Sequence, residues 1–359
     1  MTSRRRAVSA PKPRRTRSVC IGPLTIGGGA PIAVQSMTTT RTDDVKATLR
    51  QIRRLENAGC EIVRLAVPDE KAAAALPAIR DRTALPLVAD IHFDYRLALA
   101  AIRAGFDKVR INPGNIGPRW KLHEVIAAAA DAGVAVRIGV NAGSIEKRIL
   151  KKHRRPTPAA LVESLAACIE PFARLGFENL VLSAKTASVP DLIETCRTIA
   201  RNWDYPQHLG LTEAGLPFEG AIRSAAALGV LLHEGIGDTI RISLAGDPVR
   251  EVEAAWELLA ALGRRRRGPV VIACPTCGRT GIDVVGLARR LKSRLRRETR
   301  PLKIAVMGCV VNGPGEAREA DYGICGGRGK GVVFSRGRVV CTCRESELLP
   351  ALLRVIRES

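Results

Sequence analysis

Three cysteines near the carboxyl end of the chain have the spacing of a metal or redox site. Cys274 and Cys277 form a CxxC pair directly after the apolar run 270–273, and Cys309 follows a second apolar run, 303–307. If these runs are adjacent parallel strands of a βαβ unit, the three thiols and the carboxylate of Glu316 lie at one edge of the sheet. The chain has 10 cysteines and no signal peptide, so we expect reduced thiols that bind metal rather than disulfides.

The cysteine spacing alone leaves three kinds of site open. An iron-sulfur cluster suits three thiolates and one carboxylate, and the spacing favours it. A structural zinc site commonly uses two CxxC pairs, and only the distant Cys341 and Cys343 could supply a second pair. A thioredoxin-like dithiol would explain the CxxC pair but not Cys309. We expect the other cysteines to be small apolar side chains: Cys20, Cys60, Cys168, Cys196 and Cys325.

A second group of polar residues lies at the carboxyl ends of predicted strands. It comprises Asp90 and His92, Arg110 and Asn112, Arg137 and Asn141, Ser183 and Lys185, and Arg241 and Ser243, with Gln35, Ser36, Thr212 and Glu213 ending two other strands. Each pair has one parity, so its members face the same side of the strand. In a closed parallel barrel these ends meet at one mouth. The cations among them would repel one another there, so we expect a phosphate or diphosphate ligand rather than separate pairing with helix carboxylates.

Alternating elements from residue 31 to about 263 position this second group. Short β-branched runs alternate with Ala- and Leu-rich amphipathic stretches in eight pairs. The predicted strands are Pro31–Met37, Glu61–Val67, Pro86–Ile91, Lys108–Asn112, Ala135–Asn141, Asn179–Lys185, His208–Gly215 and Asp238–Gly246, and the predicted helices include Asp43–Ala58, Tyr95–Ala104, Leu122–Ala132 and Thr157–Leu175. This pattern predicts an α/β fold with a (β/α)8 TIM-type barrel rather than an open doubly wound sheet.

Composition divides the chain into four parts. We expect a basic flexible tail over 1–18, the barrel over 19–263, a linker over 264–269 and a smaller α/β domain carrying the cysteines over 270–359. A chain of 359 residues is long enough for a barrel of about 250 residues and a second, smaller core.

The net charge of +22 raises the question of nucleic-acid binding. The excess charge is concentrated in 4–17, 264–267 and 289–300, and none of these runs has interleaved aromatic residues for base stacking. We therefore expect no nucleic-acid partner. No apolar run reaches membrane-spanning length, so we expect no membrane association and a cytoplasmic location. The competing interpretation is a basic barrel that binds RNA with the help of a zinc-stabilised second domain.

Motifs along nearly the whole chain after the basic tail resemble those of one enzyme family. They are the segments 34–37, 58–64, 88–94, 108–115, 137–144, 211–215, 274–283 and 307–316. Each motif is weak by itself, but their order is specific. The chain resembles the 4-hydroxy-3-methylbut-2-enyl diphosphate synthases of the non-mevalonate isoprenoid pathway, in the two-domain form found in bacteria.

The resemblance implies an iron-sulfur oxidoreductase. Cys274, Cys277 and Cys309 would bind a [4Fe-4S] cluster, with Glu316 as a displaceable fourth ligand that also takes part in catalysis. The implied reaction is the reductive dehydroxylation and ring opening of 2-C-methyl-D-erythritol 2,4-cyclodiphosphate, with single electrons from flavodoxin or ferredoxin. A homodimer is also implied, in which the cluster domain of one subunit caps the barrel of the other.

The resemblance also assigns roles to the polar strand ends. The expected substrate contacts are Arg64, Asp90, His92, Arg110, Asn112, Arg137, Asn141, Ser183, Lys185, Thr212, Arg241 and Ser243. Glu213 is expected to deliver or orient a proton. Cys325, Cys341 and Cys343 match no ligand of the family.

Overall fold

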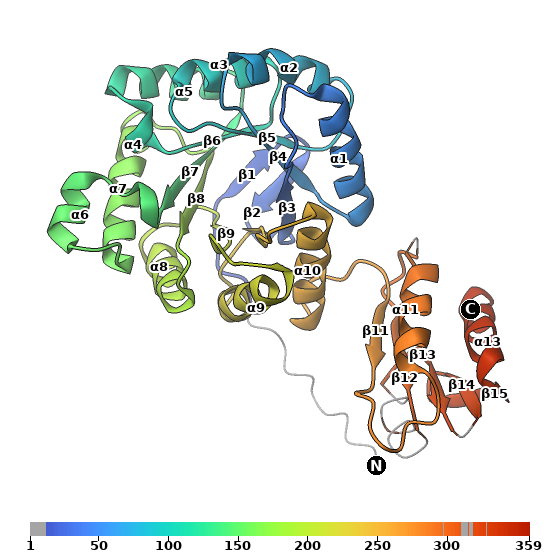
Figure 1. Ribbon diagram of the computed structural model, residues 1–359. Coiled ribbons are helices and arrows are strands. Elements are labelled where there is room, and N and C mark those ends of the chain that lie inside the picture. The colour runs from blue at the N-terminus through green and yellow to red at the C-terminus, as the bar shows by residue number, and fades with distance from the viewer. Residues whose placement is uncertain (1–11, 297, 310–314, 316–318, 328) are drawn as a thin grey trace. The chain divides into compact units, whose positions relative to one another are not determined.

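The computed structural model describes residues 12–296, 298–309, 315, 319–327 and 329–359 (Figure 1). The chain divides into two compact units, Met1–Arg265 and Arg266–Ser359. The boundary between them lies inside the segment 264–269 that the sequence predicts as a linker.

The first unit is built on an eight-stranded parallel sheet that closes into a barrel (Figure 1). In chain order its strands are β3 (Ala33–Met37), β4 (Ile62–Ala66), β5 (Leu87–Asp90), β6 (Lys108–Ile111), β7 (Ala135–Asn141), β8 (Leu180–Lys185), β9 (His208–Leu209) and β10 (Thr239–Ile240). Neighbouring strands pair from β8 down to β3 and then through β10 to β9, and a bridge from Leu182 to Gln207 closes the ring. The predicted TIM-type barrel is confirmed.

The last two strands are much shorter than the sequence predicts. We expected 208–215 and 238–246, but β9 and β10 have only two residues each. Within or at the end of the predicted ranges, Glu213 has a φ of 53° and Gly246 a φ of 138°, neither of which is an extended conformation. The polar residues that follow β9 and β10 therefore lie on loops rather than on strands.

Helices surround the barrel (Figure 1). They are α1 (Val45–Ala58), α2 (Glu70–Arg80), α3 (Tyr95–Arg103), α4 (Pro113–Ile116), α5 (Arg119–Asp131), α6 (Lys147–His153), α7 (Pro158–Arg174), α8 (Val189–Asn202), α9 (Pro217–His233) and α10 (Pro248–Ala261). Several begin at a side chain that accepts a backbone N–H, such as Asp44 before α1 and Thr157 before α7. None of the described helices combines the length and the apolar character needed to cross a membrane.

An amino-terminal hairpin packs against the barrel and was not predicted. Strands β1 (Ser18–Ile21) and β2 (Leu24–Gly27) pair antiparallel. The buried side chains of Val19, Ile21 and Ile26 pack with the first inward-facing apolar residues of the barrel strands. The hairpin therefore covers the apolar, amino-terminal end of the barrel interior.

The last residues of the predicted basic tail contact the barrel. Arg14 donates to the carbonyls of Ala200, at 2.7 Å, and Tyr205, at 2.9 Å, and Arg17 binds Asp204 at 2.8 Å. A guanidinium at the carboxyl end of a helix is favourable because it meets carbonyls that have no partner within the helix. Residues 1–11 of the predicted tail lie outside the described residues.

The second unit contains a five-stranded sheet in the order β11-β12-β13-β14-β15 (Figure 1). Its elements are β11 (Val270–Ala273), α11 (Val284–Arg294), β12 (Lys303–Met307), β13 (Tyr322–Gly326), β14 (Lys330–Ser335), β15 (Arg338–Arg344) and α13 (Glu345–Arg357). β11 and β12 are parallel neighbours, as the sequence predicts, and β13 joins β12 in parallel. Apolar residues of α11 and α13 pack on one face of this sheet.

Candidate active site

A polar cavity of about 210 Å³ lies in the mouth of the barrel. Its lining consists of Arg64, Asp90, His92, Arg110, Arg137, Gly139, Asn141, Ser183, Lys185, Leu211, Thr212, Arg241 and Ser243. Every substrate contact predicted from the sequence is in this set except Asn112. The parity argument therefore found side chains that share one cavity, and their contact with a substrate remains a prediction.

Asn112 is buried beside the cavity, and its side chain forms hydrogen bonds with the neighbouring loops. Its side-chain oxygen accepts the N–H of Gly114 at 3.2 Å and so caps α4, and its side-chain amide donates to Ser144 Oγ at 3.1 Å. These bonds hold the loops after β6 and β7 together. Asn112 is thus placed to shape the mouth rather than to line it.

Asp90 lies at the centre of a group of cations. Its carboxylate is 3.1 Å from Arg110 Nη1, 3.8 Å from Arg64 Nε and 3.6 Å from His92 Nε2. Burial by itself raises the pKa of this carboxyl, but the charge of Arg64, a hydrogen bond with His92 and the charges of Arg110 and Arg137 outweigh it and hold the pKa well below its ordinary value. Asp90 is therefore ionised and orients the cations around it.

Arg241 is held by a carboxylate that the sequence analysis missed. Arg241 Nε and Nη2 donate to the two carboxylate oxygens of Glu251, on α10, at 3.0 and 2.9 Å. The same carboxylate accepts the Ser36 hydroxyl at 2.8 Å and the Leu244 N–H at 3.1 Å. Glu251 sits four residues into an ordinary amphipathic helix, and only its acidic character on the buried face could have indicated this role.

Other cations in the barrel interior have no such compensation. Arg137 Nε and Nη1 and Lys108 Nζ are buried without a hydrogen-bond partner in the described part of the chain. Burial, followed by the charges of Arg64 and Arg110, lowers the pKa of Arg137 well below its ordinary value. Burial and then the surrounding arginines do the same to the pKa of Lys185. An anion in the cavity would remove this unfavourable electrostatic energy.

Two glycines leave room for the cations. A Cβ at Gly139 would lie 2.5 Å from Arg110 Nε, and a Cβ at Gly210 would lie 2.8 Å from Lys185 Nζ and 2.6 Å from the Arg241 carbonyl oxygen. Both glycines interrupt or follow strands, where a glycine often marks a close approach of another group. The positions of these two glycines in the sequence could therefore have indicated a close approach of other groups.

Glu213 lies outside the lining of the cavity. Its side chain is exposed, directly after the lining residue Thr212, and its backbone has the left-handed φ of 53°. Such a conformation costs roughly 1 kcal/mol in a residue other than glycine. A strained residue beside a cavity is a candidate for a functional role, and the prediction for Glu213 stays a prediction.

The predicted cluster ligands that the structure describes do not share one cavity as the barrel residues do. Cys274 and Cys309 follow the neighbouring parallel strands β11 and β12, and Gly308 N donates to Cys274 Sγ at 3.1 Å. Cys277 is exposed, and its N–H is bound to Thr280 Oγ1 at 3.0 Å. Among the described residues, no group of three His, Cys, Asp or Glu side chains is close enough to hold a metal ion. Glu316 lies outside the described residues.

The other cysteines of the second unit lie on both faces of its sheet. Cys325 is buried on β13, and burial, followed by the thiols of Cys309 and Cys274, raises its pKa to about 11. Cys341 and Cys343 lie on β15 and pack on the face covered by α11 and α13. They are therefore on the opposite face from Cys325, which belongs to a separate apolar cluster, and Cys274 packs against both clusters.

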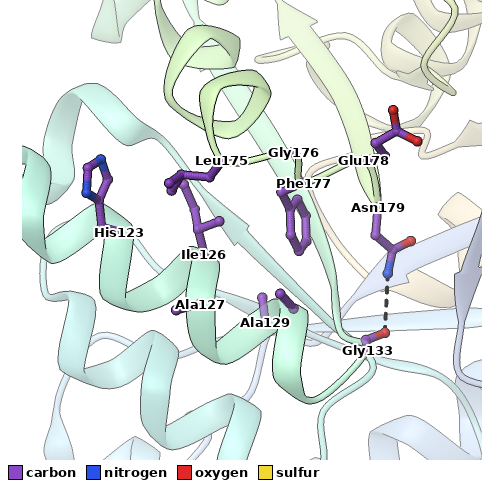
Figure 2. A pocket seen from close by; sticks show the side chains of 11 residues that line it. His123, Ile126, Ala127, Ala129, Gly133, Leu175, Gly176, Phe177, Glu178 and Asn179 are labelled. Atoms are coloured by element: carbon purple, nitrogen blue, oxygen red, sulfur yellow. Dashed lines mark hydrogen bonds between the residues drawn. The ribbon is translucent and has the colours of Figure 1, made fainter.

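A larger cavity, of about 460 Å³, lies between α5 and the end of α7, beside the amino-terminal ends of β7 and β8. Figure 2 shows its mainly apolar lining, which includes Ile126, Leu175 and Phe177, and on the far side of Phe177 the hydrogen bond from Asn179 to the Gly133 carbonyl, which is 3.2 Å long. It contains no predicted site residue, and it is at the other end of the barrel from the polar mouth.

Comparison with known families accounts for both units. Residues 16–256 match the GcpE TIM-barrel domain, and residues 270–358 match the GcpE protein C-terminal domain. The chain belongs to the GcpE family. The family resemblance noted from the ordered motifs is thereby confirmed.

Relatives in the GcpE family match the chain over nearly its whole length. A Lawsonia intracellularis protein is 55% identical over 91% of this chain and 91% of its own. A Thermodesulfovibrio yellowstonii protein is 50% identical over 97% of this chain and 99% of its own. Both are named 4-hydroxy-3-methylbut-2-en-1-yl diphosphate synthase (flavodoxin). Among solved structures, Yersinia pestis dihydropteroate synthase is 14% identical, with a TM-score of 0.47 over 68% of this chain and 98% of its own.

Proposed function

We propose that this GcpE family chain converts 2-C-methyl-D-erythritol 2,4-cyclodiphosphate to 4-hydroxy-3-methylbut-2-enyl diphosphate by reductive dehydroxylation and ring opening. The observation that carries the proposal is the barrel cavity, whose buried cations exceed its acids and therefore suit a diphosphate. The name shared by the relatives supports the same substrate and reaction.

The barrel residues bind and orient the substrate. Arg110, Arg137 and Lys185 donate to diphosphate oxygens, because charge-assisted hydrogen bonds from fixed cations are the strongest available to a phosphate. Ser183, Ser243, Thr212 and Asn141 line the same cavity and supply neutral hydrogen-bonding groups for the remaining oxygens. Asp90 and Glu251 keep the arginines in place, so little side-chain entropy is lost on binding.

The chemistry of the cysteine set fits an iron-sulfur cluster. Cys274, Cys277 and Cys309 supply thiolates from a CxxC turn and an adjacent strand end, and the N–H of Gly308 already donates to the Cys274 sulfur, which stabilises a thiolate. Cys274, Cys277 and Cys309 would hold a [4Fe-4S] cluster, with Glu316 at its fourth position. When bound, the cluster supplies the two electrons one at a time, and flavodoxin is the proposed donor.

Glu213 is the proposed proton donor. The substrate hydroxyl leaves as water only if a proton reaches its oxygen, and a carboxyl group at the mouth can deliver one. Glu213 directly follows the lining residue Thr212, and its backbone has a left-handed φ of 53°.

A homodimer and a cytoplasmic location complete the proposal. Large apolar side chains follow β5 and β9 at the mouth end of the barrel, where Phe93 is 72% exposed, Leu216 64% and Phe218 74%. Exposed apolar groups that border a polar cavity suit an interface. We assign this surface to the second unit of a partner subunit, which would also exclude water from the reaction.

Anaerobically purified protein tests the proposal. The protein is incubated with the cyclodiphosphate and reduced flavodoxin, and the product is identified by mass spectrometry, with Cys309→Ser as the control. Conversion by the wild type and none by the variant supports the proposal. A colourless zinc protein, or an iron-loaded protein without conversion, contradicts it.

A further inference from the structure

Cys325 lies on the same face of the second sheet as Cys274, one of the predicted cluster ligands. On parallel neighbours, Ala273 of β11 pairs with Val306 of β12, so the next residue, Cys274, is level with Met307. Met307 in turn pairs with Cys325 of β13. Cys274 and Cys325 therefore flank Met307 and point to one side of the sheet, because residues in register on parallel strands share a face.

The surroundings of Cys325 fix its thiol in place. Its side chain is only 4% exposed and packs in a cluster with Ala305, Met307 and Phe334, against which Cys274 also packs. Adjacent strands are about 4.8 Å apart, so the backbone of Cys325 is roughly 10 Å from that of Cys274. Met307 lies between the two residues in the register, and the thiols of Cys309 and Cys274 both act electrostatically on Cys325, so Cys325 faces the ligand-bearing edge without needing to be a ligand.

We propose that Cys325 is a positioning residue whose neutral S–H donates a weak hydrogen bond to the sulfur atoms of the cluster and raises its reduction potential. The inference rests on the proposed cluster. Hydrogen bonds to cluster sulfurs favour the reduced form, because that form carries more negative charge. Nothing in the family match assigns Cys325, which the sequence analysis treated as a plain apolar residue.

The chain offers a matched control on the same sheet. Cys341 of β15 pairs with Val333 of β14, which belongs to the apolar cluster on the opposite face, covered by α11 and α13. Removing the Cys341 thiol changes the sheet by the same few atoms, on the face opposite to Cys325.

The test is a redox titration, followed by electron paramagnetic resonance, of anaerobically purified wild type, Cys325→Ala, Cys325→Ser and Cys341→Ala. We expect full iron content in all four proteins, a lower potential in Cys325→Ala, and a wild-type potential in Cys341→Ala. In Cys325→Ser we expect a potential no lower than that of the wild type, because a hydroxyl is the better donor.

Two results would overturn the role of Cys325. One is an unchanged potential in Cys325→Ala, or an equal shift in the Ala and Ser variants, either of which would mean that the S–H donates nothing to the cluster. The other is a loss of iron in Cys325→Ala, which would make the residue a ligand. A wild type without iron would instead contradict the proposed function, so the two failures are distinguishable.

Discussion

The barrel mouth and the cysteine edge of the second unit are built in different ways. In the mouth, strands place buried side chains within one cavity, and Asp90 and Glu251 fix the arginines at hydrogen-bonding distance. At the cysteine edge, Cys274 and Cys309 come from neighbouring strand ends, Cys277 is exposed on a loop, and the described residues form no metal-binding group. The barrel itself positions the side chains of the cavity, whereas the described cysteines are near one another without forming a metal-binding group.

The difference reflects what holds each site together. A barrel core positions its inward-facing side chains whether or not a ligand is bound. A metal site is often completed by the metal, because the free energy of ligation orders the loops that carry the ligands. We therefore expect the two sites to respond differently to mutation.

The largest expected effect is that of Cys309→Ser. Loss of a cluster ligand should remove the iron and lower the rate of conversion by more than about 100-fold, while binding of the cyclodiphosphate to the barrel changes by less than about twofold. Iron analysis, an anaerobic assay and calorimetry measure the three quantities. Cys341→Ser is the control and should keep its iron. If Cys309→Ser lost substrate binding together with its iron, the barrel mouth would depend on the metal site, which would contradict the account.

Glu251→Gln tests whether the mouth depends on its buried ion pair. Arg241 would lose the charge of its partner, and breaking such a pair costs about 3–5 kcal/mol of the free energy of unfolding. Urea unfolding followed by tryptophan fluorescence reports on this unit alone, because Trp120, Trp203 and Trp256 all belong to it. The exposed pair of Glu253 with Arg250 gives the control, since Glu253→Gln should cost less than about 1 kcal/mol. Equal effects in the two variants would refute the role of Glu251.

Asp90 gives the mouth a characteristic pH dependence. Its pKa in the folded protein is below that in the unfolded chain, so its ionised form stabilises the fold above about pH 4, and this stabilisation is lost as the pH falls further. The difference in the free energy of unfolding between wild type and Asp90→Asn should therefore be constant from about pH 5 to 7 and should shrink below about pH 4. Asp94→Asn, at an exposed pair with Arg96, should show little difference at any pH. A constant difference for Asp90 down to about pH 3 would contradict the account.

The smallest expected effect concerns the backbone at Glu213. Glu213→Gly removes a left-handed strain and should stabilise the barrel by up to about 1 kcal/mol, although glycine also gains freedom in the unfolded chain. If the carboxyl group delivers a proton, Glu213→Gly and Glu213→Gln should both lower kcat with little change in KM. Full activity in Glu213→Gln would contradict the role of Glu213 as a proton donor. The backbone strain would then be the one remaining property of this residue in the account.

The sequence predicted the mouth better than the edge for a physical reason. Parity along a strand dictates which side chains share a face, so Arg110, Arg137 and Lys185 could be brought together without coordinates. The partners of such residues, such as Glu251 on a distant helix, depend on tertiary packing and leave no local pattern. Asn112 has the expected parity, but its side chain caps α4 instead of lining the cavity. Parity along the strand cannot reveal such a local hydrogen bond between side chain and backbone.

The elements that escaped prediction also depend on contacts distant in sequence. The hairpin of β1 and β2 is defined by its burial against the barrel base, and β9 and β10 pair with their neighbours over only two residues each. In the second unit the parallel pair β11 and β12 was predicted from its apolar runs. The face on which Cys325 lies became visible only with the strand register.

The most direct test of the central claim is calorimetric titration of the cyclodiphosphate into the full chain before and after iron-sulfur loading. If the mouth is complete in the protein alone, the iron-free chain should bind the ligand with an affinity within about tenfold of that of the loaded chain, and Arg137→Met should abolish binding in both. Binding that occurs only after loading would contradict the claim, because it would show that the mouth, like the cysteine edge, is assembled only when the metal is present.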